Sequence, residues 1–308
     1  MLKLIRGRNG SGKTSWCLER IVERAKMGKE SVLIVRENLD FTFEKELVKR
    51  LEPAERRFCE VTNLKKLCRD VIRKNGGVSR VFLDDAEQVA LLRKIVLDCE
   101  KDLSFYRKRG RDMAFYEMLG QLFEELRAEK AGPAVLRELS GKCRSDLSRQ
   151  KFLEIALLLE RYEKEMERSY FDGSGEMETA GQMLPKSGTF QDKEVFIDGF
   201  FSFNAVTRSL ICEIAACAPQ VYVTVECTGD AADKETAFAA TAKSADRLKS
   251  AYWKRYGIWP EEEVFPADDA TKPSGIVNAE HFFGMVDWSS DGTDVLYLLE
   301  GNSIYDEV

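Results

Sequence analysis

The order of apolar and polar positions in the first fifty residues predicts an α/β protein. Leu2 to Arg6 is a short apolar run, a glycine-rich stretch follows it, and a helix is expected to begin near Lys13. Residues 31–35 (SVLIV) form a continuous apolar run typical of a strand buried on both faces of a parallel sheet. Residues 43–51 then have a helical pattern. A strand followed by a helix, repeated once, indicates the opening of a parallel sheet.

The pattern changes to long helices in the middle of the chain. Before the change, a strand is predicted at 58–61, a helix at 64–74 and a strand at 78–83. From 84 to about 169, apolar residues recur at helical spacing, as in the series Phe115, Leu119, Leu122, Phe123 and Leu126. This block is interpreted as a large all-helical subdomain inserted into the α/β fold.

Strand signals return in the last third. Residues 172–193 are rich in Gly, Ser, Thr and Pro and are expected to form loops around a short helix. The later elements are expected at 194–197 (strand), 204–216 (helix), 220–226 (strand), 245–256 (helix) and 295–299 (strand). The predicted organisation is therefore a parallel-sheet domain in two parts, 1–83 and 194–308, separated by a helical insertion with loops at 84–193.

Charge and composition restrict the chemistry. The 308 residues carry a net charge of −6, divided as +6, −2 and −10 over residues 1–100, 101–200 and 201–308. A basic first third suggests a surface that handles phosphate. The single histidine, His281, leaves little material for a histidine-based active site. Eight scattered cysteines without a CxxC pair, no signal peptide and no membrane-spanning run predict a cytoplasmic protein that does not act at a membrane.

One motif carries specific chemistry. Gly7, Arg8, Asn9, Gly10, Ser11, Gly12, Lys13 and Thr14 match G-x-x-x-x-G-K-[ST], the P-loop. Its glycines let successive backbone N–H groups converge on phosphate oxygens, its lysine reaches the β and γ phosphates, and its hydroxyl holds Mg²⁺. The motif lies between a predicted strand and a predicted helix, so ATP and Mg²⁺ are the expected ligands.

The P-loop needs an acidic partner at the end of a neighbouring strand, and two candidates compete. Residues 81–85 (VFLDD) end in Asp84 and Asp85, and residues 195–199 (VFIDG) contain Asp198. Asp84 followed by Glu87 is also a capping-box signature, which explains it without a metal. Asp198 is therefore favoured as the Mg²⁺ ligand together with Thr14, and Asp84 or Asp85 remains the alternative.

A wider resemblance rests on four segments. With the P-loop at the N-terminus, residues 33–38 (LIVREN), 61–67 (VTNLKKL) and 195–204 (VFIDGFFSFN), the chain resembles the N-terminal part of AddB/RexB. That family is one of the two subunits of the bacterial ATP-dependent helicase/deoxyribonuclease. The resemblance implies a superfamily-1 helicase fold, in which a RecA-like first domain (1A) carries the helical insertion as subdomain 1B.

The resemblance also implies partners and a reduced activity. Active superfamily-1 helicases have a glutamate after the metal-binding aspartate, where this chain has Gly199, so nucleotide binding without hydrolysis is expected. The family pairs with an AddA/RexA-type motor protein as a heterodimer at DNA ends, and its iron–sulfur cluster belongs to a later nuclease part that is not visible in this sequence. Single-stranded DNA would contact the strand-end segments, with Arg36, Asn38, Thr62, Lys65 and Lys66 as candidates.

Two functions follow from these observations. The first is an ATP-binding, hydrolysis-impaired helicase-like domain of a DNA break repair helicase–nuclease, cut from a longer chain and neither helicase nor nuclease alone. The second is a structural, DNA-binding module with a vestigial P-loop that docks the motor protein.

Overall fold

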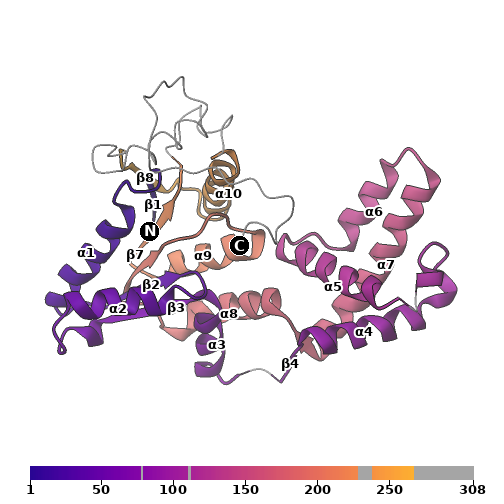
Figure 1. Cartoon of the computed structure of the whole chain (residues 1–308), viewed down its shortest axis with the longest axis horizontal. Helices are drawn as coiled ribbons and strands as arrows, with labels where there is room; N and C mark the ends of the chain where they lie inside the picture. The colour runs from indigo at the N-terminus through magenta and orange to yellow at the C-terminus, as the bar shows by residue number, and fades with distance from the viewer. Residues whose placement is uncertain (78, 110–111, 228–237, 267–308) are drawn as a thin grey trace, which may run out of the picture.

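A six-stranded parallel sheet organises the protein. The computed structural model describes residues 1–77, 79–109, 112–227 and 238–266. The strand order is β3-β2-β6-β7-β1-β8, and every neighbouring pair is parallel (Figure 1). The strands are β1 (Leu2–Arg6), β2 (Ser31–Val35), β3 (Cys59–Asn63), β6 (Glu194–Ile197), β7 (Gln220–Val225) and β8 (Glu261–Val264).

Apolar clusters cover both faces of this sheet, because successive side chains of a strand point to opposite faces. In β2, Val32 and Ile34 join the cluster on one face, and Leu33 and Val35 join the cluster on the other. Helices α1 (Lys13–Lys26) and α2 (Asp40–Arg50) pack on the second face. The first face is covered by α3 (Leu64–Lys74), α8 (Gly173–Ser187), α9 (Ala205–Cys217) and α10 (Ala239–Tyr256).

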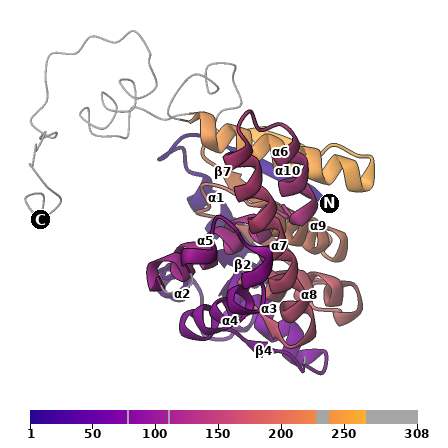
Figure 2. The ribbon, with the colours of Figure 1, turned by 90° about the vertical axis from the view of Figure 1, so that its right-hand side faces the viewer.

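The helices between β4 and β5 form a separate apolar cluster. Helix α4 (Asp85–Asp98) and helix α7 (Asp146–Arg168) enclose large buried side chains, among them Phe123 and Tyr162. This helical region extends away from the sheet in Figure 1 and lies in front of it in Figure 2. Its other elements are α5 (Met113–Ala128), α6 (Pro133–Gly141) and the short 3-10 helices Glu100–Asp102 and Arg107–Arg109, and a further 3-10 turn, Arg56–Phe58, precedes β3.

The strand expected at 78–83 is much shorter and lies elsewhere. Strand β4 (Val81–Phe82) pairs with β5 (Tyr170–Phe171) in a two-stranded sheet and does not join the six-stranded one. Both residues of β4 are exposed. The apolar run therefore leads the chain from α3 into the helical region and adds no strand to the main sheet, which corrects the prediction.

The segment 172–193, expected as loops around a short helix, mostly forms the 15-residue helix α8. Asp172 begins the helix by accepting a hydrogen bond from the Gly175 N–H at 2.7 Å, and Ala180 and Leu184 are buried in the cluster beside the sheet. Burial between α3 and α9 outweighs the weak helix propensity of the glycines. The buried face of α8 thus belongs to the sheet layer, although the expected insertion ran to residue 193.

The remaining elements agree with the expected order. The opening strand–loop–helix, the helix at 64–74 and the pair α9 and β7 are confirmed. The strand expected at 295–299 lies outside the described residues. Among the helices that the structure describes, none is long and apolar enough to cross a membrane.

Candidate functional site

The glycine-rich loop connects β1 to α1 at the carboxyl edge of the sheet. Gly12 immediately precedes the helix with a φ of 87°, in the left-handed region that favours glycine. A Cβ on Gly7 would lie 2.4 Å from Ser11 Oγ and 2.9 Å from the Phe265 carbonyl oxygen. Both glycines are therefore required by the path of the backbone around the loop.

Lys13 folds back over this loop. Its ammonium donates hydrogen bonds to the carbonyl oxygens of Gly7 at 2.7 Å and Arg8 at 2.8 Å, and Ser11 Oγ lies 3.4 Å away. The residue is 7% exposed, so a positive charge is held at the centre of the loop. Such a charge beside a helix N-terminus favours an anion.

Asp198 links the neighbouring strands to this loop. It follows β6 and is 3% exposed, and its Oδ2 accepts a hydrogen bond from Thr14 Oγ1 at 2.8 Å. Its Oδ1 accepts a second hydrogen bond from the Thr224 hydroxyl on β7. A hydroxyl and a carboxylate within hydrogen-bond distance form an oxygen donor pair of the type that Mg²⁺ accepts. The residues present therefore fit a magnesium–nucleotide ligand.

A cavity of about 270 Å³ lies over these groups. Its walls come from the loop, from the start of α1 and from the ends of β6 and β7, and they comprise Asn9, Gly10, Ser11, Gly12, Lys13, Thr14, Ser15, Asp198, Gly199, Phe200, Thr224 and Glu226. Thr224 and Glu226 were missed by sequence reasoning. Their signal was their position at the carboxyl end of a strand predicted at 220–226, next to the Asp198 strand.

The competing acids occupy a different place. Asp84 Oδ1 accepts the Glu87 N–H at 2.8 Å, and Glu87 Oε2 accepts the Asp84 N–H at 3.1 Å, which completes a capping box at the start of α4. Asp84 and Asp85 follow β4, outside the six-stranded sheet, and neither lines the cavity. Of the two candidates, the structure brings Asp198 to the glycine-rich loop.

The strand-end residues suggested for DNA are only partly exposed. Arg36 follows β2, and its guanidinium lies 4.8 Å from the centre of the Phe201 ring, which is 56% exposed. Lys65 and Lys66 are exposed at the start of α3.

The other two candidates lie nearby in different settings. Asn38, two residues after Arg36, has a positive φ of 71°, and Thr62 is buried at 1% exposure. The exposed aromatic ring of Phe201 was not foreseen, because residues 200–203 were considered only with the acidic motif.

Comparison with known proteins identifies the family. A family model described as "ADDB, N-terminal" matches residues 4–272, which is most of the chain. The chain belongs to the AddB N-terminal family. The predicted resemblance to the N-terminal part of AddB/RexB is thereby confirmed.

Curated relatives extend beyond this AddB N-terminal chain. The B-subunit of the ATP-dependent helicase/deoxyribonuclease of Thermoanaerobacter sp. (strain X514) is 26% identical over 251 residues, covering 80% of this chain and 22% of that protein. The protein of the same name from Bacillus cereus (strain B4264) is 27% identical over 234 residues, covering 73% and 20%. The chain thus spans about a fifth of the length of these relatives.

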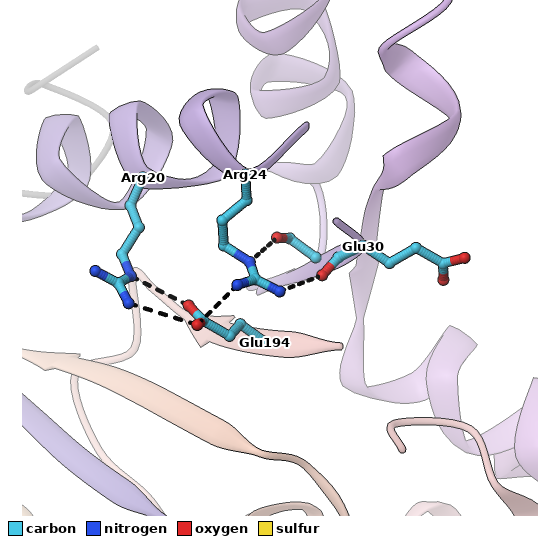
Figure 3. A network of polar contacts seen from close by, with 5 residues as sticks. Arg20, Arg24, Glu30 and Glu194 are labelled. Atoms are coloured by element: carbon cyan, nitrogen blue, oxygen red, sulfur yellow. Dashed lines mark hydrogen bonds and ion pairs between the residues drawn. The ribbon is translucent and has the colours of Figure 1, made fainter. Parts of the chain in front are cut away.

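In this AddB N-terminal chain, ion pairs hold helix α1 against the sheet. Glu194, at the start of β6, accepts hydrogen bonds from Arg20 at 3.1 Å and from Arg24 at 2.8 Å (Figure 3). Arg24 also donates to the Glu30 carbonyl oxygen at 3.0 Å and to Ser31 Oγ at 3.1 Å. The helix that begins with Lys13 and Thr14 is therefore fixed at its far end to the strand that carries Asp198.

The described residues hold no cluster of three or more His, Cys, Asp or Glu side chains that could bind a metal ion. All eight cysteines are free thiols, and burial raises the pKa of the Cys17 thiol. Cys17, Cys68 and Cys212 are buried among apolar side chains, where they pack as small hydrophobic residues.

Proposed function

We propose that this chain is an ATP-binding, hydrolysis-impaired, RecA-like domain of a helicase–nuclease. The observation that carries the proposal is the hydrogen bond between Thr14 and Asp198, beside the buried ammonium of Lys13. These three groups come from the loop, from α1 and from the end of β6, and their arrangement matches the needs of a magnesium–nucleotide ligand.

Each residue has a defined part in binding. Lys13 would exchange its contacts with the Gly7 and Arg8 carbonyl oxygens for oxygens of the β and γ phosphates. Thr14 and Asp198 would hold Mg²⁺, and the backbone N–H groups of residues 9–13 would receive the remaining phosphate oxygens. When bound, ATP and Mg²⁺ supply the charges that these side chains and backbone groups recognise.

Hydrolysis would be impaired because the position after Asp198 carries no side chain. Gly199 adopts a φ of 80°, and it stands where active helicases of the resembled superfamily carry the glutamate that orients the attacking water. Without that carboxylate, water in the cavity is not activated by the residue next to the metal ligand.

The wider role follows from the relatives. Because they are named as the B-subunit of an ATP-dependent helicase/deoxyribonuclease, we propose that the complete protein pairs with an AddA/RexA-type motor protein at DNA ends during break repair. The helical region α4–α7 would be the inserted 1B subdomain. Single-stranded DNA would pass the carboxyl edge of the sheet, where the exposed Arg36, Phe201, Lys65 and Lys66 and the neighbouring Asn38 and Thr62 lie.

Calorimetry with ATP and Mg²⁺ tests the binding site. Lys13→Ala should weaken binding at least ten-fold, because it removes the cation that faces the phosphates. Lys26→Ala is the matched control, since Lys26 is an exposed lysine at the other end of the same helix, and it should bind ATP like the unaltered chain. Absence of binding, or equal binding by Lys13→Ala, would refute the proposal.

A second candidate function is a DNA-binding and docking module whose glycine-rich loop is vestigial. The exposed Arg36–Phe201 pair favours it, because a guanidinium and an aromatic face suit a phosphate and an unpaired base. Salt-dependent binding of single-stranded oligonucleotides that ATP does not alter, together with no ATP binding by calorimetry, would select this function.

A further inference from the structure

Helix α10 presents a basic stripe on its outer side. Lys243, Arg247 and Lys254 are exposed and recur at spacings of four and seven residues, which places them on one face of a helix. The opposite face, including Ala245 and Leu248, is buried against the sheet layer. The stripe spans about 16 Å along the helix axis, and both views place α10 at the margin of the molecule (Figures 1 and 2).

The charges of this stripe are not neutralised by the residues that the structure describes. The side chains of Lys243, Arg247 and Lys254 have no ion pair or hydrogen bond within the described ranges. They line a groove of about 880 Å³ together with Arg208 of α9. The acid in this groove, Asp246, lies 3.7 Å from the guanidinium of Arg6, so the groove is predominantly basic.

Two exposed tryptophans lie at the end of the same helix. Trp253 of α10 and Trp259 of the following loop stack with ring centres 5.4 Å apart and planes inclined by 16°. They are 42% and 56% exposed, and Ile258 beside them is 63% exposed. Large aromatic faces left in water next to a row of cations offer stacking surfaces for unpaired bases.

We propose that this groove and the tryptophan pair bind single-stranded nucleic acid. The cations would contact successive phosphates, and the tryptophan pair would stack on a base at the end of the stripe. Duplex ends offer few unpaired bases, so a single strand fits better than a duplex. The surface is separate from the Arg36 edge and from the ATP cavity, and it does not depend on the function proposed for them.

Anisotropy of a fluorescein-labelled twenty-nucleotide oligodeoxythymidylate tests the proposal with the 308-residue chain. The triple variant Lys243→Gln/Arg247→Gln/Lys254→Gln should bind at least ten-fold more weakly, and the slope of log K against log salt should fall by about 2. The double variant Trp253→Ala/Trp259→Ala should bind at least about five-fold more weakly and lose the quenching of tryptophan fluorescence. The duplex of the same length should bind more weakly to the unaltered chain.

The controls separate this surface from a general effect of positive charge and from misfolding. Lys142→Gln/Arg149→Gln/Lys164→Gln removes the same charge from exposed cations paired with Glu138, Asp146 and Glu160 and should change binding less than two-fold. Lys13→Ala should retain oligonucleotide binding, and circular dichroism verifies that each variant is folded. The proposal is overturned if folded α10 variants bind the oligonucleotide normally, including the case in which they instead fail to join a partner protein.

Discussion

At the scale of residues, Gly199 and Glu226 decide what the nucleotide cavity can do. Gly199 contributes no carboxylate beside Asp198, whereas Glu226 lines the same cavity from the end of β7. Asp198 already accepts hydrogen bonds from Thr14 and Thr224, so its oxygens are directed toward hydroxyl groups and a cation. A general base for water would have to come from another acid, and Glu226 is the acid available among the described residues lining the cavity.

Phosphate release measures this directly. We expect the unaltered chain to release phosphate from ATP at a rate no higher than that of Asp198→Asn, because no carboxylate next to the metal ligand activates water. Glu226→Gln should leave the rate unchanged. Rapid release that Glu226→Gln abolishes would contradict this prediction and assign the water-activating role to Glu226.

At the scale of elements, helix α1 is held at both ends. Its first residues reach Asp198 through Thr14, and its last turns reach Glu194 through Arg20 and Arg24 (Figure 3). Both acids belong to the β6 segment, so one strand sets the position of the helix that carries Lys13. Trp16 adds edge contacts to Phe196 and Tyr222 between these two anchors.

Removing the Glu194 anchor should weaken the fold. Glu194→Gln keeps the shape of the side chain but leaves the Arg20 and Arg24 cations without their carboxylate, and the free energy of unfolding in urea should fall by about 1–3 kcal/mol. Glu46→Gln on α2 is the control, because Glu46 pairs with Lys49 and Arg50 at the surface, and its effect should be much smaller. Equal effects of the two substitutions would show that the anchor is not stabilising.

At the scale of the whole molecule, two apolar cores stand beside each other. The clusters on the two faces of the sheet involve α1–α3 and α8–α10, while α4, α5, α6 and α7 enclose a cluster of their own. Glu154 anchors the helical core. Its buried carboxylate accepts hydrogen bonds from the Ser104, Phe105 and Tyr106 N–H groups at 2.8, 2.9 and 2.9 Å.

Acid should weaken the helical core through this group. Although burial opposes ionisation of Glu154, the backbone and Gln150 hydrogen bonds lower its pKa from 4.5 to about 2. Its stabilising contribution is therefore complete above about pH 4.5 and is lost as the pH falls toward 2. Glu154→Gln should lower the unfolding free energy at pH 7 by about 2 kcal/mol and flatten this part of the pH dependence, which urea titrations between pH 2 and 7 would measure.

Part of the fold was predictable because it depends on local pattern. The run SVLIV could only be a strand buried on both faces, and residues 64–74 showed one apolar face and began after Asn63, which caps α3 by accepting the Lys66 N–H. Strand β8 was not predictable, since its sequence is EEEV. Its acids are satisfied by Lys3 at 2.8 Å and Arg6 at 2.6 Å, cations supplied by the neighbouring β1.

The sequence by itself determined the glycine-rich loop, its lysine and hydroxyl, the alternation of strands and helices and the family, because these depend on spacing along the chain. Only the tertiary structure decided which acid reaches the loop. Asp84 and Asp198 follow similar apolar runs, but β6 lies between β2 and β7, whereas β4 pairs outside the sheet. Strand neighbours, the burial of α8 and the exposure of Phe201 and the α10 groove result from long-range packing, which no local pattern records.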